Sequence, residues 1–371
     1  MSQQSANESP VFVLAQRLGL QIDAIETAWS AALRVKRDLR ESIGESQILT
    51  GGDDSDRSFV VFGSLARNEF TGEGRSDVDW TLLVDGLAMI QDIDLVHELT
   101  RLVERSGHKT PNKTGPFGNL AFSHDLIHQI GGSDDTNANT TQRLLLLLES
   151  TALYGDSVRS RVIRNILSRY VLEDESFLNG KHPEHVPRFL LNDVARYWRT
   201  MTVDFQTKKR ERENKGFALR NVKLRFSRKL LYLAGLIACF SFSIWRDDES
   251  LRTTWGEQHS TRERGVRLVS YLERITNTPP PELVSKAFLR LKLEGEATRR
   301  FLLSYEGFVR LLSDSTNRDH LEKLPPQKMA SDSLYQNARE LSHEFQGAIG
   351  ELFLRPESGM LSDLTIKYGV F

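Results

Sequence analysis

The chain has 371 residues, which corresponds to about two domains of roughly 150 residues each and allows sizeable buried cores. Hydrophobic residues make up 39% and charged residues 27%, and the formal net charge of −1 excludes a polycationic packaging protein and an acidic tail protein. The single cysteine, Cys239, excludes an internal disulfide framework and any zinc module built on several cysteines, and it fits a reducing cytoplasm.

The sequence lacks the patterns of export and membrane insertion. Residues 1–9 are polar and do not have the basic-then-apolar order of a secretory signal. The most apolar run, residues 230–245, is shorter than the ~20 residues that span a bilayer, and it contains Ser241 and Ser243. We expect this run to form a buried helix in a soluble, cytoplasmic protein with no membrane partner.

In chain order, the N-terminal part mixes helical and strand-like patterns. Apolar residues at helical spacing over 12–48 predict one or two amphipathic helices. Short apolar runs bounded by glycine or aspartate predict buried strands over 59–62 and 80–84. A helix is predicted over 90–104 and a third strand over 120–130.

The pattern changes after the two glycines at 131–132. Residues 141–154 predict a strongly apolar helix, and nearly every later segment has helical periodicity. We therefore expect an α+β domain over residues 1–170, with a short mixed sheet flanked by helices. An all-α domain is expected over residues 171–371.

The segment 59–85 contains residue types that suit phosphate chemistry. Gly63 and Ser64 follow a strand and precede an expected helix, so their N–H groups can face a phosphate, which glycine allows to approach closely. Asp77 and Asp79 lie two residues apart, so on an extended chain both carboxylates project from one face. Such a pair repels itself unless a cation intervenes, and Mg²⁺ suits oxygen ligands shared with substrate phosphates.

A two-metal site for in-line attack on a nucleotide α-phosphate needs a third carboxylate on a neighbouring strand. Asp125, inside the predicted third strand, is the best candidate in the sequence. We expect it to hold one metal ion and to act as the base that activates the incoming hydroxyl. A Gly-Ser pair alone is usually only a turn, and a strand aspartate often pairs with an arginine.

These residues also carry a resemblance. Residues 63–69 read GSLARNE and residues 76–79 read SDVD, which resembles the signature of the DNA polymerase β-like nucleotidyltransferase superfamily. The Ala-Arg-x-Glu after Gly-Ser, and the stretch 139–156 ending in Gly-Asp, are most similar to the nucleotidyltransferase domain of PII-protein uridylyltransferases and glutamine-synthetase adenylyltransferases. The likeness covers residues 59–156, under a third of the chain.

The resemblance implies a Mg²⁺-dependent transfer of a nucleoside monophosphate from an NTP to an acceptor hydroxyl, with two metal ions and release of pyrophosphate. The three aspartates would hold the metals, and Gly63 and Ser64 would bind the triphosphate, helped by Arg67 or Lys223. It also implies a transferase without the reverse hydrolysis. The reason is that the only His-Asp dipeptide, at 124–125, lies on the expected catalytic strand.

Residues 206–232 form a basic segment. It holds ten Lys or Arg and two Glu, so it contributes +8 and the rest of the chain sums to −9. By analogy with the helical domains of the superfamily, we expect Lys223, with Ser227 or Arg228, to hold the β- and γ-phosphates. The same charge also suits RNA or an acidic protein, or a solvated helix face.

The sequence does not choose between ATP, UTP, CTP and GTP. A protein side chain (Tyr, Ser or Thr) is the leading expectation for the acceptor, through the likeness to protein-modifying relatives. The alternatives are a tRNA 3′ end, a small molecule, or a second nucleotide as in cyclic oligonucleotide synthases. A non-enzymatic alternative is a nucleotide-binding regulatory protein on a degenerate transferase fold, which the intact Asp77 and Asp79 disfavour.

Overall fold

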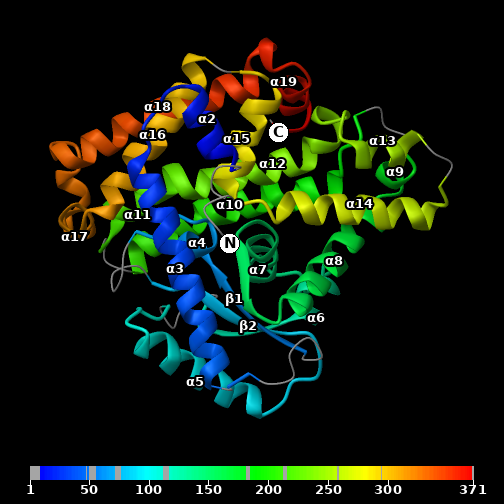
Figure 1. The fold of residues 1–371 in the computed structure, drawn as a ribbon, viewed down its shortest axis with the longest axis horizontal. Helices are drawn as coiled ribbons and strands as arrows, with labels where there is room; N and C mark the ends of the chain where they lie inside the picture. Colours follow the sequence, from blue (N-terminus) through cyan, green and yellow to red (C-terminus); the bar gives the residue numbers. More distant parts are fainter. Residues whose placement is uncertain are drawn as a thin grey trace. The chain divides into compact units, whose positions relative to one another are not determined.

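The structure is a computed structural model that describes residues 9–46, 48–49, 56–71, 77–111, 117–180, 184–211, 215–256, 259–293 and 295–369. The chain forms two compact units (Figure 1). Unit 1 comprises Met1–Thr27, Gly180–Thr253 and Pro280–Phe371, and unit 2 comprises Ala28–Asn179 and Thr254–Pro279. The predicted domain boundary between residues 170 and 171 stays a prediction.

A mixed four-stranded sheet lies in the N-terminal half of the chain, and an all-helical region follows it, which confirms the predicted fold class. Among the described residues the strands are β1 (Arg57–Phe62), β2 (Trp80–Val84), β3 (Asn119–Phe122) and β4 (Ser150–Tyr154), in the order β3-β2-β1-β4. β1 is antiparallel to both β2 and β4, whereas β2 and β3 are parallel. The strands predicted over 59–62 and 80–84 are therefore confirmed as β1 and β2.

Alternating side chains give the sheet of unit 2 two apolar faces. On one face Val61 and Trp80 pack into a core with helices α3 (Asp23–Ser46) and α5 (Gln91–Arg105). On the other face Phe62, Thr81 and Leu83 lie against α7 (Asn137–Leu148). The remaining helices of unit 2 are α4 (Gly63–Ala66), α6 (Ser123–Ile127), α8 (Asp156–Leu172), α9 (Glu175–Leu178) and α14 (Thr261–Thr276).

The predicted strand over 120–130 is wrong beyond Phe122, because the chain turns there into α6. Leu126 and Ile127 are both buried, at 2% and 5% exposure. Adjacent residues point to opposite faces in a strand but can share one side of a helix. A short apolar run does not distinguish a strand from a helix by its periodicity.

The predicted helix over 141–154 is also wrong in its second half. α7 ends at Leu148, and Ser150–Tyr154 forms β4, which pairs with β1. Gly155 then turns the chain into α8 with φ +66°, where a Cβ would lie 2.3 Å from the carbonyl oxygen of Arg57. Pairing with a distant strand overrides the local helical pattern here.

The described part of unit 1 is helical. Its helices and turns are α2 (Pro10–Arg17), α10 (Arg188–Glu211), α11 (Phe217–Lys223), the π-turn η2 (Leu224–Arg228), α12 (Lys229–Ile244), α15 (Pro280–Arg290), α16 (Glu296–Ser313), α17 (Ser315–Lys323), η3 (Pro326–Lys328), α18 (Ser333–Leu354), η4 (Pro356–Ser358), α19 (Met360–Leu364) and η5 (Thr365–Gly369). Helix α13 (Glu249–Gly256) runs across the division between the units, as does α3, whose first residues up to Thr27 belong to unit 1. In the core, the ring of Phe226 stacks on that of Phe308 with centroids 4.5 Å apart.

Helix α12 contains the most apolar run of the sequence, and most of its side chains are buried, as expected. Among the described residues, the segment Phe217–Ile244 has the length and apolar composition of a membrane span, and 78% of its most apolar window is buried inside the structure. The core helix of a soluble protein has the same properties. The expected cytoplasmic location stays a prediction.

Candidate functional site

The Gly-Ser and Asp-x-Asp motifs meet in unit 2 where β1 ends and β2 begins. We call this end of the two central strands the Gly63–Asp79 edge. Because β1 and β2 are antiparallel, the residues that follow β1 lie beside those that precede β2. The backbone N–H of Phe62 donates to the carbonyl oxygen of Asp79 over 2.8 Å. This hydrogen bond places Gly63 directly beside Asp79.

Gly63 is required at this edge for two reasons. Its φ is +66°, in the left-handed region that L side chains rarely adopt. A Cβ at this position would also lie 2.8 Å from Oδ2 of Asp79. The glycine therefore makes the sharp turn out of β1 and leaves room for the Asp79 carboxylate itself.

Asp77 and Asp79 project from the same side of the chain. Val78 and Trp80, which alternate with them, are fully buried on the opposite side, in the core beneath α3 and α5. Asp77 is exposed and Asp79 is half-buried. The N–H of Val78 donates to the carbonyl oxygen of Lys109 over 2.9 Å, which holds this stretch extended before β2 begins.

Arg67 lies just beyond α4, the helix expected after β1, which is a single turn. Its guanidinium is 7% exposed and forms ion pairs with Glu69, with Nε 3.0 Å from Oε2, and with Glu149. Arg67 thus ties the turn after Gly63 to the start of β4. Its direct contact with a triphosphate stays a prediction.

Glu149 was missed by sequence reasoning. It follows a run of leucines that ends at Leu148, and it is 3% exposed. A carboxylate at the end of an apolar run needs a cationic partner once it is buried, because an unpaired buried charge is costly. That mismatch was the available signal, but the sequence could not identify Arg67 as the partner.

The structure does not bring Asp125 to Asp77 and Asp79. Asp125 lies in α6, after the end of β3, whereas the other two aspartates precede the start of the parallel strand β2. Asp125 therefore lies at the opposite end of the strands from Asp77 and Asp79. Within the described ranges, no three His, Cys, Asp or Glu side chains are grouped so that they could hold a metal ion.

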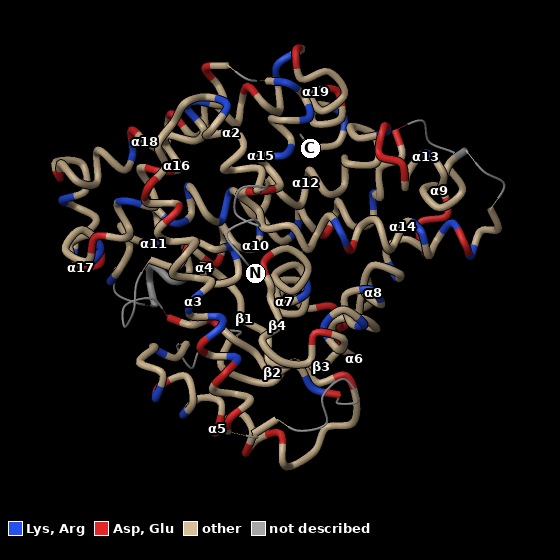
Figure 2. The backbone as a smooth tube through the Cα atoms, in the orientation of Figure 1, with Lys and Arg blue, Asp and Glu red and all other residues tan. Residues whose placement is uncertain are grey.

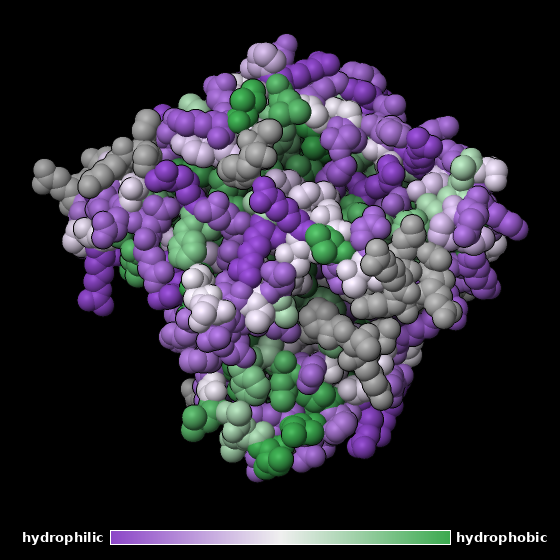
Figure 3. Space-filling view, turned by 180° about the vertical axis from the view of Figure 1, so that it is seen from behind, coloured by the Kyte–Doolittle hydropathy of each residue, from purple (hydrophilic) through white to green (hydrophobic). Residues whose placement is uncertain are grey.

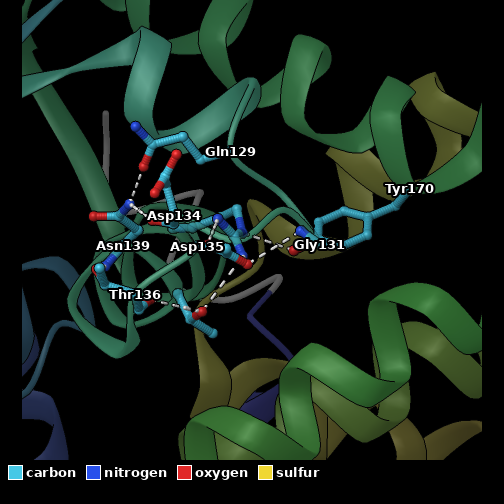
Figure 4. A network of polar contacts seen from close by, with 9 residues as sticks. Gln129, Gly131, Asp134, Asp135, Thr136, Asn139 and Tyr170 are labelled. Atoms are coloured by element: carbon cyan, nitrogen blue, oxygen red, sulfur yellow. Dashed lines mark hydrogen bonds and ion pairs between the residues drawn. The ribbon is translucent and has the colours of Figure 1, made fainter.

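Asp125 instead contacts Gln129, which belongs to a polar network around the turn between α6 and α7. Figure 4 shows this network from Gln129 to Tyr170. Its Oδ1 accepts a hydrogen bond from Nε2 of Gln129 over 2.9 Å, and the Gln129 side chain also contacts Asn139. Nearby, Asp135 pairs with the fully buried Arg143, whose Nε donates to the hydroxyl of Tyr170 over 2.7 Å. Asp125 is therefore part of the hydrogen-bonded network that connects α6 with α7.

The edge formed by Asp77 and Asp79 fits a magnesium ion shared with a substrate. Mg²⁺ is commonly held by one or two carboxylates together with substrate phosphates and water. The missing Cβ of Gly63 lets the Asp79 carboxylate lie against the turn that follows β1, so a metal ion held by Asp79 would be close to the backbone of that turn. The expectation of two metal ions stays a prediction, because no third carboxylate joins this pair among the described residues.

Comparison of the chain with protein-family models, curated proteins and solved structures finds no match. The functional assignment therefore depends on the residues and geometry of the Gly63–Asp79 edge.

Lys223 and Ser227 lie in unit 1, on the basic segment 206–232. Lys223 is the last residue of α11, and Ser227 lies in the π-turn η2 at 5% exposure. Single π-turns inside helices are frequent at functional sites. Because these residues belong to a different unit from Asp77 and Asp79, their predicted contact with the triphosphate stays a prediction. Residues 212–214 of the segment, and Ser76 of the SDVD motif, are outside the described residues.

Proposed function

We propose that this protein is a Mg²⁺-dependent nucleotidyltransferase that moves a nucleoside monophosphate from an NTP to an acceptor hydroxyl. The observation that carries the proposal is the contact between the two motifs. Gly63 and Asp79 are separated by a loop in the sequence, yet a Cβ on one would lie 2.8 Å from the carboxylate of the other. The pairing of β1 with β2 thus brings the glycine turn and the carboxylate to one place, where a single substrate can contact both.

Each residue at this edge has a chemical part in the proposed reaction. Asp77 and Asp79 bind Mg²⁺, which when bound neutralises charge on the phosphates. The N–H groups of Gly63 and Ser64 orient the triphosphate. The acceptor oxygen then attacks the α-phosphorus, the bond to pyrophosphate breaks, and the hydroxyl proton passes to a base. Asp77, the exposed carboxylate, replaces Asp125 as our candidate for that base.

Asparagine substitutions test the proposal. Asp77→Asn and Asp79→Asn are expected to lower transfer by at least about 100-fold, the scale on which losing one electrostatic contact affects catalysis. Asp125→Asn is the matched control and is expected to retain activity. The measurement is the transfer of label from each α-³²P NTP into cell lysate, together with release of pyrophosphate.

Two outcomes would contradict these assignments. Full transfer by Asp79→Asn would eliminate the proposed metal site. Loss of transfer in Asp125→Asn, with unchanged unfolding free energy, would return Asp125 to the catalytic residues. Stabilisation by NTP and Mg²⁺ without pyrophosphate release in any lysate would favour the nucleotide-binding regulatory protein.

We infer that the acceptor is a protein hydroxyl, on the basis of the resemblance to protein-modifying transferases. The +8 charge of residues 206–232 favours RNA as the second candidate. Binding of RNA to a basic segment weakens steeply as the salt concentration rises, because the counterions that binding displaces are then released less favourably. The fate of the label in the lysate, and the salt dependence of transfer, distinguish the two acceptors.

A further inference from the structure

An exposed apolar loop lies between β2 and the first turn of α5 in unit 2. The exposed fractions of Leu87, Met89, Ile90 and Ile93 are 86%, 51%, 74% and 49%. Apolar side chains also gather at the lower end of the molecule in Figure 3. We call residues 87–93 the apolar loop.

The apolar loop is held in place by a buried ion pair. Asp92 is 1% exposed, and its Oδ1 accepts a hydrogen bond from Nε of Arg57 over 2.6 Å. Its Oδ2 accepts from the N–H of Met89 over 2.9 Å. Leu99 and Leu102 anchor the inner face of α5 in the core. The apolar side chains are thus presented outward by a fixed backbone, which lowers the entropy lost on binding.

The size of this surface suits a transient partner. Its side chains expose on the order of 500 Å², which is the size of the largest apolar patch on a typical monomer, a patch that is often functional. A stable interface of standard size buries about 800 Å² per partner. The exposed surface of the apolar loop is smaller than that, which suits a partner that binds transiently.

Charge indicates the kind of partner. From Asp85 to Glu98 the chain has no Lys or Arg. Asp85 is paired with Arg161, with Nε 2.6 Å from Oδ2, which leaves the exposed Asp94 and Glu98 beside the apolar loop. A second copy of the chain that docked through the same loop would bring its acidic groups next to those of the first copy, and like charges repel. A basic, amphipathic segment would instead satisfy both the apolar and the acidic groups.

We propose that the apolar loop docks a basic, amphipathic segment of a partner protein, and that this partner is the acceptor of the transfer. The identity of the partner as the acceptor rests on the proposed function, whereas the docking of a basic segment does not. The loop follows the C-terminal end of β2, whereas Asp79 precedes its N-terminal end. β2 spans about 16 Å. The modified residue must therefore lie at least about five extended residues from the docking segment.

Two synthetic peptides test the docking surface. One is an amphipathic helix of leucine and lysine of about 18 residues, long enough to form a helix, and the other replaces each lysine with glutamate. Fluorescence anisotropy with the full chain is expected to show binding of the lysine peptide only. Leu87→Ser/Ile90→Ser is expected to weaken that binding at least about 10-fold, since anchors at interface centres dominate affinity.

Val203→Ser/Val266→Ser is the matched control, because these valines are 66% and 61% exposed at other places. It is expected to bind the lysine peptide like the wild type. Equal affinity in both double variants would overturn the proposal. So would binding of the glutamate peptide, or sedimentation velocity showing a dimer that only Leu87→Ser/Ile90→Ser dissociates. Asp79→Asn is expected to retain peptide binding, so the failure of docking and the failure of the proposed transferase are separable.

Discussion

Gly63 connects the two halves of the candidate site. Its left-handed φ of +66° turns the chain out of β1, and its missing side chain leaves room beside Asp79. The sequence indicated a phosphate-facing turn at this residue. It could not show that the space in question is next to a carboxylate, because that contact depends on the pairing of β1 with β2.

Gly63→Ala is expected to destabilise the protein and to impair transfer. The left-handed backbone alone costs about 1–2 kcal/mol for a residue with a Cβ. The added methyl group must also displace the Asp79 carboxylate. Gly19→Ala is the control, because Gly19 has φ +61° and no atom within 4 Å of its Cβ position.

Urea unfolding is therefore expected to show a similar decrease in unfolding free energy for both alanine variants. The rate of pyrophosphate release is expected to fall only in Gly63→Ala. Wild-type activity in Gly63→Ala would show that the position of Asp79 is unimportant for the reaction.

Among the elements, β1 and α5 are joined by the Arg57–Asp92 ion pair. Burial would by itself raise the pKa of the Asp92 carboxyl. Hydrogen bonds from Arg57 and from the N–H of Met89, with the positive charge of Arg57, bring it below its ordinary value. The same pairing raises the pKa of Arg57.

The pair is expected to stabilise the fold in a defined pH range. Because the folded-state pKa of Asp92 lies below its ordinary value of 3.8, the unfolded chain binds more protons between the two values. The stabilisation is therefore complete well above pH 3.8 and is lost as the pH falls from there through the folded-state pKa. Urea unfolding from pH 6 to pH 3 measures this loss.

Asp92→Asn is expected to show a weaker decline of unfolding free energy on the acid side than the wild type. Asp94→Asn keeps the ion pair and is expected to retain the decline. Identical acid profiles for the wild type and Asp92→Asn would contradict this assignment.

In the molecule as a whole, the near-zero net charge is a cancellation. Figure 2 shows Lys and Arg together with Asp and Glu along most helices, whereas α12 is almost free of both. The described part of the basic segment lies on α10, α11, η2 and the start of α12 in unit 1. The candidate metal ligands lie in unit 2.

Lys223→Ala is expected to raise the KM for the NTP by about 10-fold with little change in kcat, as for the loss of one hydrogen bond to a charged group. Lys215→Ala is the control, since Lys215 is exposed on the same basic segment. Steady-state kinetics with pyrophosphate detection measures both variants. Equal KM values would show that Lys223 does not bind the nucleotide.

The local patterns of this sequence were sufficient for the fold class and for β1 and β2, whereas the roles of Gly63 and Asp79 stay predictions. Alternation of side chains and turn chemistry act over a few neighbouring residues. The place of Asp125, the ion pairs of Arg67 and the outward presentation of Leu87 could not be derived in this way. They depend on strand order, on register and on which surfaces find partners, and these are set by contacts between residues far apart in the chain.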